Sequence, residues 1–133
     1  MVARGSVTLS NSGLPYPIRC SNGSCGQIEL PGVPLGSFPG IIYDQVTLDL
    51  QPDDLFVFCT DGIFEALDPQ GTEFGALRIC EVVETHQREP ARVIVDAIFD
   101  AVTTFRDSAA QLDDMTAVAV KIAKEASQVK TRA

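Results

Sequence analysis

Two acidic motifs contain the side chains of this chain that are best suited to chemistry. Asp61 and Gly62 follow the apolar run 55–59, which is rich in residues that favour strands. Asp113 and Asp114 stand just before a second segment of strand-forming residues. Carboxylates at strand ends, beside a glycine that lets backbone approach closely, can hold a hard divalent cation through oxygen ligands. Each motif alone is also typical of an ordinary turn or a solvated loop.

Both motifs belong to an ordered set of short pieces that covers nearly the whole chain. The set begins with Ser-Asn-Ser-Gly-Leu-Pro at 10–15 and continues with Pro-Leu-Gly at 34–36. Leu-Gln-Pro-Asp-Asp at 50–54 precedes the first acidic motif, and Gly-Thr-Glu-Phe-Gly at 71–75 follows it. In this order the pieces resemble the metal-dependent protein serine/threonine phosphatases of type 2C. Within that family they are most similar to the bacterial stage II sporulation protein E branch.

The resemblance implies an α+β fold, the C-terminal portion of a four-layer αββα sandwich with mostly antiparallel sheets and two helices here. It also implies two Mn²⁺ or Mg²⁺ ions that activate a water molecule for hydrolysis of phosphoserine or phosphothreonine. Asp61 and Asp113 match the family's two later metal aspartates. Gly62 is expected as a close-approach position, and Asp114 in a supporting role. Glu65 is expected either to support the ligands or to cap the short helix after the first motif.

Two departures from the family pattern bear on activity. The family's first metal motif, an aspartate-glycine pair, has no counterpart ahead of Val7. Two carboxylates do not suffice for two ions that each take about six oxygen ligands, so we expect the isolated chain to be inactive. Leu14 stands where the sporulation-type phosphatases usually carry a histidine. An excised fragment, a truncated gene product and a half-domain that needs a separate N-terminal half or sensor domain all fit this pattern.

Three functions fit these residues. The first is the metal-binding C-terminal part of a phosphoprotein phosphatase, which is active when the domain is complete. By resemblance, its substrate is a phosphorylated anti-sigma-factor antagonist in a bacterial stress or sporulation circuit. The second is a non-catalytic protein-interaction module on the same fold, and the third is a different hydrolase or a structural domain. Because half a two-sheet domain exposes strand edges and an apolar sheet face, we also expect self-association.

Composition favours a folded cytoplasmic domain that binds neither nucleic acid nor membrane. Of 133 residues, 45% are apolar, and the net charge is −8. Nucleic-acid binding needs clustered Lys and Arg, which this acidic chain lacks. Its apolar runs are too short to span a bilayer, and its first residues lack the apolar core of a signal peptide. Its cysteines are expected to form neither a zinc site nor a disulfide in a reducing compartment; they are Cys20, Cys25, Cys59 and Cys80.

The hydrophobic pattern predicts strands in the first half and helices in the second. Strands are expected at 5–10, 16–20, 26–30, 41–50, 54–59 and 115–122. Helices are expected at 74–87 and 90–106, and the second has apolar residues at three- and four-residue spacing, which indicates one buried face. We expect residues 1–123 to form the partial phosphatase domain and the charged tail 124–133 to fray.

Overall fold

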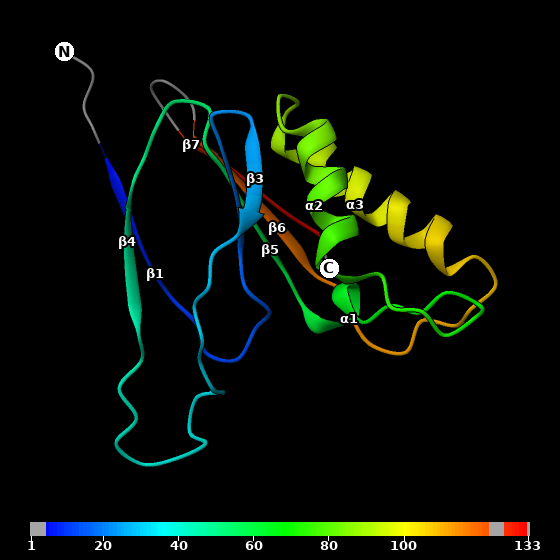
Figure 1. Ribbon diagram of the computed structural model, residues 1–133, viewed down its shortest axis with the longest axis horizontal. Helices are drawn as coiled ribbons and strands as arrows, with labels where there is room; N and C mark the ends of the chain where they lie inside the picture. Colours follow the sequence, from blue (N-terminus) through cyan, green and yellow to red (C-terminus); the bar gives the residue numbers. More distant parts are fainter. Residues whose placement is uncertain (1–4, 123–126, 133) are drawn as a thin grey trace.

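The computed structural model describes residues 5–122 and 127–132, which form seven strands and three helices in three layers. The strands are β1 (Ser6–Ser10), β2 (Ile18–Ser21), β3 (Ser24–Gln27), β4 (Gln45–Asp49), β5 (Leu55–Cys59), β6 (Ala117–Ile122) and β7 (Ser127–Arg132). The helices are α1 (Asp61–Phe64), α2 (Gly75–His86) and α3 (Ala91–Arg106). Helices α2 and α3 cover one face of the larger sheet, and the small β1–β4 sheet lies on its other side (Figure 1). None of the described helices combines the length and apolarity needed to cross a membrane.

The larger sheet has the strand order β3-β2-β5-β6-β7, and each pair of neighbours is antiparallel. Strand β5 lies at its centre, in keeping with an apolar sequence in which four of the five residues are buried. Its register with β6 sets Cys59 opposite Ala117. The smaller sheet pairs β1 with β4, also antiparallel. The α+β class and the antiparallel sheets expected from the sequence are confirmed.

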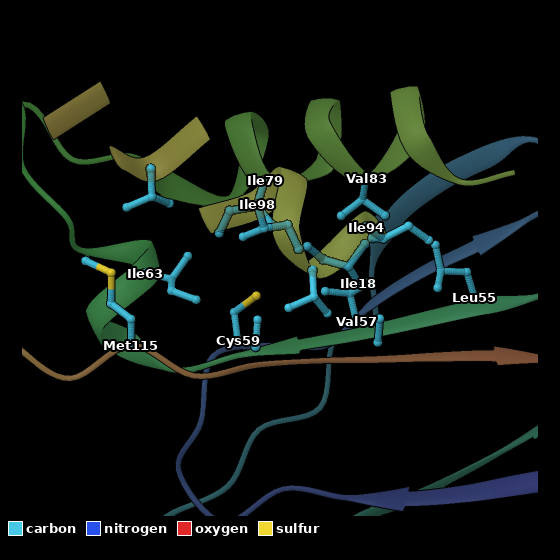
Figure 2. Close-up of a cluster of buried hydrophobic side chains, with 14 of the residues drawn as sticks. Ile18, Leu55, Val57, Cys59, Ile63, Ile79, Val83, Ile94, Ile98 and Met115 are labelled. Atoms are coloured by element: carbon cyan, nitrogen blue, oxygen red, sulfur yellow. The ribbon is translucent and has the colours of Figure 1, made fainter. Parts of the chain in front are cut away.

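An aliphatic core fills the space between the larger sheet and the helices (Figure 2). Alternate residues of the sheet contribute one side of it: Ile18, Cys20, Leu55, Val57, Cys59, Ala117 and Ala119. The buried face of α3 is the one that the spacing predicts: Ala91, Ile94, Val95, Ile98 and Val102. This packing fixes β5 and β6, and the acidic motifs lie at the ends of these two strands.

A buried ion pair links the larger sheet to β4. Asp54 is 1% exposed and accepts hydrogen bonds from Arg19 Nη2 (2.8 Å) and Ser21 Oγ (2.7 Å). The same Arg19 nitrogen donates to the carbonyl oxygen of Asp49 at the end of β4 (2.8 Å). Burial alone would raise the pKa of Asp54, but these hydrogen bonds, one from the Gln51 N–H and the Arg19 charge together lower it.

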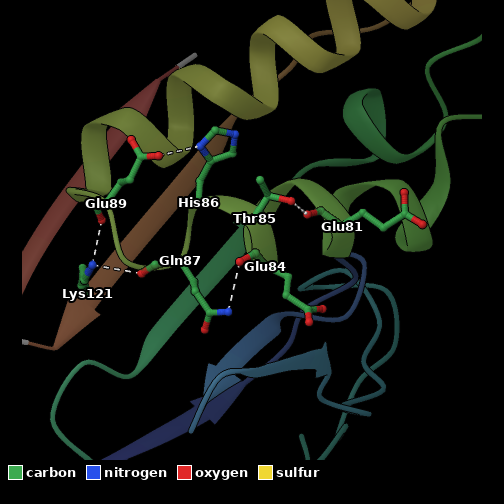
Figure 3. Close-up of polar contacts among 7 residues, drawn as sticks. All are labelled: Glu81, Glu84, Thr85, His86, Gln87, Glu89 and Lys121. Carbon is green, nitrogen blue, oxygen red and sulfur yellow. Dashed lines mark hydrogen bonds and ion pairs between the residues drawn. The ribbon is translucent and has the colours of Figure 1, made fainter.

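The junction between α2 and α3 is tied to the end of β6 (Figure 3). The Lys121 ammonium donates to the carbonyl oxygens of Gln87 (3.0 Å) and Glu89 (2.8 Å). Nδ1 of His86 lies 3.0 Å from Oε1 of Glu89 in the same turn. These bonds satisfy carbonyl groups that follow the end of α2. The junction is therefore held against the end of β6, and α3, which follows it, leads into the second acidic motif.

Several elements differ from the expectation, and β2, β4 and β6 each begin two to four residues later than expected. Strand β3 covers 24–27 rather than 26–30, because Asn22 and Gly23 both take positive φ (53° and 83°) and form a two-residue hairpin turn. The tail that we expected to fray contains β7, which pairs with β6 from Ser127 to Arg132. The short helix that was expected after the first motif is α1, which covers four residues.

Cys20 and Cys25 form a disulfide across the β2–β3 hairpin, so the expectation of reduced thiols was wrong for this pair. The two residues face each other in the strand register, with their Cα atoms 4.0 Å apart. The two-residue turn between the strands brings them together. In the described chain, Cys59 and Cys80 are free thiols. Burial raises the pKa of Cys59 to about 12.

Candidate metal centre

The two acidic motifs lie side by side at one end of the larger sheet. Asp61 begins α1 directly after β5, and Asp113 and Asp114 come shortly before β6. Because β5 and β6 are antiparallel neighbours, the end of one strand lies beside the beginning of the other. All three aspartates are exposed. The fold thus brings together the segments that carry the expected ligands, and their role as ligands stays a prediction.

Gly62 lies against the backbone of the second acidic motif. A Cβ atom added to Gly62 would overlap the carbonyl oxygen of Asp114 and lie 2.9 Å from its carbonyl carbon. Real Cβ atoms do not approach backbone so closely, so any other residue would push the motifs apart. The backbone of Gly62 is helical, and the requirement for glycine is therefore one of space. This contact is the close approach that the sequence suggested for Gly62.

Thr60 and Thr116 connect the motifs by hydrogen bonds. The Thr60 N–H donates to the carbonyl oxygen of Thr116 (3.0 Å), and Thr60 Oγ1 accepts from the Thr116 N–H (2.9 Å). The same hydroxyl donates to the Thr116 carbonyl oxygen over a longer distance, 3.4 Å. Sequence reasoning assigned no role to either threonine. The available signal was that each stands within two residues of an acidic motif.

Local hydrogen bonds shape the loop that carries Asp113. The Gln111 side-chain amide donates to the carbonyl oxygen of Asp113 (2.9 Å), and the Asp114 N–H donates to Oδ1 of Asp113 (2.8 Å). Met115, the next residue, is buried in the core. The loop is therefore anchored on one side by the core, while its carboxylates face solvent.

Glu65 lies at the C-terminal end of α1, where its N–H donates to the carbonyl oxygen of Asp61 (2.8 Å). It is therefore the C-cap residue of that helix, through its backbone N–H rather than its carboxylate, in line with one of its two expected roles. With Asp113 and Arg106, it lines a small cavity of about 90 Å³ beside the second motif. The position of Glu65 fits the other expected role, that of a carboxylate near the ligands.

These residues fit a hard divalent cation in the type of ligand but not in number. Asp61, Asp113 and Asp114 offer exposed carboxylate oxygens, which Mg²⁺ and Mn²⁺ prefer. Within residues 5–122 and 127–132, no three His, Cys, Asp or Glu side chains lie close enough together to hold a metal ion. These carboxylates of the described residues therefore do not by themselves form a complete metal site.

Comparisons with known proteins identify the family. The family model described as Stage II sporulation protein E (SpoIIE) matches residues 2–123, which is most of the chain. Protein IcfG of Synechocystis sp. is similar to it, with 27% identity over 120 residues. That match covers 90% of this chain but 19% of the relative.

Solved structures with the same fold include two bacterial phosphatase domains. The PP2C phosphatase domain of the cell fate determinant SpoIIE from Bacillus subtilis, with a fragment of its regulatory domain, matches with a TM-score of 0.73 at 24% identity. The match covers 88% of this chain and 34% of that one. The SiaA-PP2C domain of Pseudomonas aeruginosa gives a TM-score of 0.65 at 22% identity, over 78% of this chain and 41% of its own.

The length of these matches shows how the chain relates to its relatives. It spans less than half of IcfG and of both solved chains. The family match over residues 2–123, the antiparallel sheets with their helices and the order of the motifs agree with one another. The chain belongs to the Stage II sporulation protein E (SpoIIE) family of type 2C phosphatases, and it corresponds to a C-terminal part of the phosphatase domain.

Proposed function

We propose that this chain is the metal-binding C-terminal part of a phosphoserine/phosphothreonine protein phosphatase. The observation that carries the proposal is the backbone contact at Gly62, which keeps Asp61 beside the loop of Asp113 and Asp114. Membership of the SpoIIE family supports the reaction class. One solved structure of the Bacillus subtilis SpoIIE phosphatase domain was presoaked with Mn, which supports Mn²⁺ as the ion to test.

In this proposal the chain holds carboxylates and the complete domain performs the reaction. Asp61 and Asp113 bind a divalent cation, while Asp114 and Glu65 add negative charge around it. A bound pair of ions supplies a water of lowered pKa and countercharge for the phosphoryl oxygens. In the Asp113 loop, the Asp114 N–H holds Oδ1 of Asp113 (2.8 Å) and the Gln111 side chain holds the main-chain carbonyl of Asp113 (2.9 Å). The remaining ligands come from the N-terminal part of the domain.

The proposed substrate is a phosphorylated protein, with the anti-sigma-factor antagonists of bacterial stress or sporulation circuits as the first to test. The Bacillus subtilis relative carries a fragment of a regulatory domain, which supports a sensor domain as a partner. The cytoplasm is the proposed compartment. The Cys20–Cys25 disulfide is unusual there, because cytoplasmic thiols are normally kept reduced.

Titration of the chain with Mn²⁺ in a calorimeter tests the ligands. We expect weak binding, with a Kd above about 1 µM, because few ligands are present. Asp61→Asn and Asp113→Asn should each weaken it at least about tenfold. Asp100→Asn, at an exposed position of α3, is the matched control and should leave the Kd unchanged. A sub-micromolar Kd, or a Kd that neither substitution changes, would show that the assignment of Asp61 and Asp113 as ligands is wrong.

A second arm of this experiment measures turnover of p-nitrophenyl phosphate by the same chain. We expect none, because the partial ligand set cannot position water on two ions. Robust Mn²⁺-dependent turnover that Asp61→Ala abolishes would show that the site is complete without further ligands.

A non-catalytic interaction module is the second candidate. The observation that favours it is the loop between β3 and β4, which exposes Leu35 (77%), Phe38 (65%) and Ile42 (93%). Large apolar side chains grouped on a surface loop are typical of protein-binding sites. A folded chain that binds no Mn²⁺ in the titration, and loses binding to a protein partner on Phe38→Ser, would favour this candidate over the first.

A further inference from the structure

The end of β5 has an unusual pattern of hydrogen bonds. The regular β5–β6 ladder ends with Cys59 opposite Ala117, and Thr60 and Thr116 form the next pair. One backbone bond of that pair is present, from the Thr60 N–H to the Thr116 carbonyl. The carbonyl oxygen of Thr60 instead accepts from Ile63 (3.0 Å) in the first turn of α1. The ladder therefore lacks one acceptor at this position.

The Thr60 hydroxyl takes the place of that acceptor. Thr60 Oγ1 receives the Thr116 N–H at 2.9 Å, which is as short as a regular ladder bond. Threonine at the residue before a helix usually caps the helix with its side chain. In the described part of the chain, Thr60 makes no such capping bond. Its hydroxyl is directed across the sheet, so β5 turns into α1 while it stays bonded to the segment before β6.

We propose that the Thr60 hydroxyl is the positioning group that fixes the distance between Asp61 and Asp113. Thr60 immediately precedes Asp61, and Thr116 follows the second motif by two residues. Gly62 brings the motifs into contact, and the hydroxyl keeps them from sliding along each other. This inference rests on the proposed function, because it concerns the two carboxylates proposed to bind Mn²⁺.

The test compares Thr60→Val, which keeps the shape but removes the hydroxyl, with Thr60→Ser, which keeps the hydroxyl. Thr47→Val is the matched control, because it removes a hydroxyl that bonds to Thr8 (2.9 Å) in the smaller sheet. Mn²⁺ affinity is measured by calorimetry and by the paramagnetic resonance signal of free Mn²⁺. We expect Thr60→Val to weaken binding about tenfold, and the other two variants to stay within about twofold of wild type.

Separate outcomes distinguish the two proposals. Wild-type affinity in a folded Thr60→Val variant overturns the positioning role, and the proposed function stands as long as Asp113→Asn still weakens binding. If Asp113→Asn leaves the Mn²⁺ affinity of the chain unchanged, the proposed function itself is overturned.

Hydrogen exchange of the unmodified chain adds a test that needs no variant. The Thr116 amide should be protected although it lies beyond the ladder, and exchange at the rate of a free amide would overturn the inference.

Discussion

Main-chain contacts of single residues set the geometry of the acidic motifs. At Gly62 the neighbouring backbone leaves no room for a side chain. At Thr60 a hydroxyl replaces a backbone acceptor. The carboxylates themselves remain exposed. Two residues without charge thus connect the segments that carry the aspartates.

Gly62→Ala tests this directly. The added methyl must displace the Asp114 carbonyl, so we expect a loss of about 1–3 kcal/mol in the free energy of unfolding and weaker Mn²⁺ binding. Urea denaturation and calorimetry measure the two effects. Gly26→Ala is the control, because nothing lies within 4 Å of its added Cβ and the change should be close to neutral. A Gly62→Ala variant as stable as Gly26→Ala would contradict the close contact.

The cysteines give a second test at this scale. Without reductant, the unfolded chain should show two reactive thiols, Cys59 and Cys80, and four after reduction. In the native protein Cys59 should react very slowly at pH 8, because a pKa of about 12 leaves roughly one thiolate in ten thousand. Thiol titration with and without denaturant measures both quantities. Four thiols before reduction would mean that the hairpin is not cross-linked.

Among the elements, the connection between β2, β4 and the start of β5 depends on one buried carboxylate. Arg19 and Asp54 lie only 2.8 Å apart, and Arg19 also reaches the backbone of β4. Removing one partner of a buried pair leaves the other unpaired, which costs about 3–5 kcal/mol when both are fully buried. Because Arg19 is partly exposed, the lower end of that range applies here.

Asp54 also makes stability depend on pH. Its pKa in the folded chain lies below its ordinary value of 3.8, so the ionised form stabilises the fold at and above that value. This stability is lost as the pH falls below 3.8 and through the lower, folded-state pKa. We expect Asp54→Asn to lose about 3 kcal/mol at pH 7 and to show a smaller loss between pH 7 and pH 3 than wild type. Urea denaturation at both pH values is the measurement, and equal acid sensitivity in the two proteins would contradict it.

The elements also show what the sequence could predict. Strand β5 and helix α3 were predictable, because their apolar patterns are local. Strand β7 was not, because five of its six residues are polar and no local apolar pattern marks it, although it pairs with β6. That the two segments carrying Asp61 and Asp113 lie side by side followed from the resemblance to the family motifs. The Thr60–Thr116 bonds join residues 56 positions apart, and only the strand register reveals them.

The molecule as a whole leaves apolar surface partly open. The smaller sheet has two strands, and the side chains on one of its faces are only half-buried: Val7, Leu9, Val46 and Leu48. Both of its strands also have an unpaired edge in the part of the chain that the structure describes. Such edges and faces favour association with another chain.

We therefore expect the chain to form dimers or larger species at micromolar concentration, measured by light scattering. Val46→Lys places a charge on the half-buried face and should reduce association, because burying an unpaired charge is costly. Thr47→Lys, on the exposed face of the same strand, is the control and should associate like wild type. A monodisperse 14.3 kDa wild-type species that melts cooperatively would contradict this prediction.

The central position of β5 also has a consequence for synthesis on the ribosome. Strand β5 pairs on one side with β2, which is made earlier, and on the other with β6, whose Ala117 follows Cys59 by 58 positions. At about 5–20 residues per second, its second edge stays bare for roughly 3–12 s after it leaves the ribosome. Through that interval an apolar strand edge is available to other nascent chains and to chaperones. The acidic motifs meet only when β6 has emerged, so the candidate metal centre forms among the last parts of the fold.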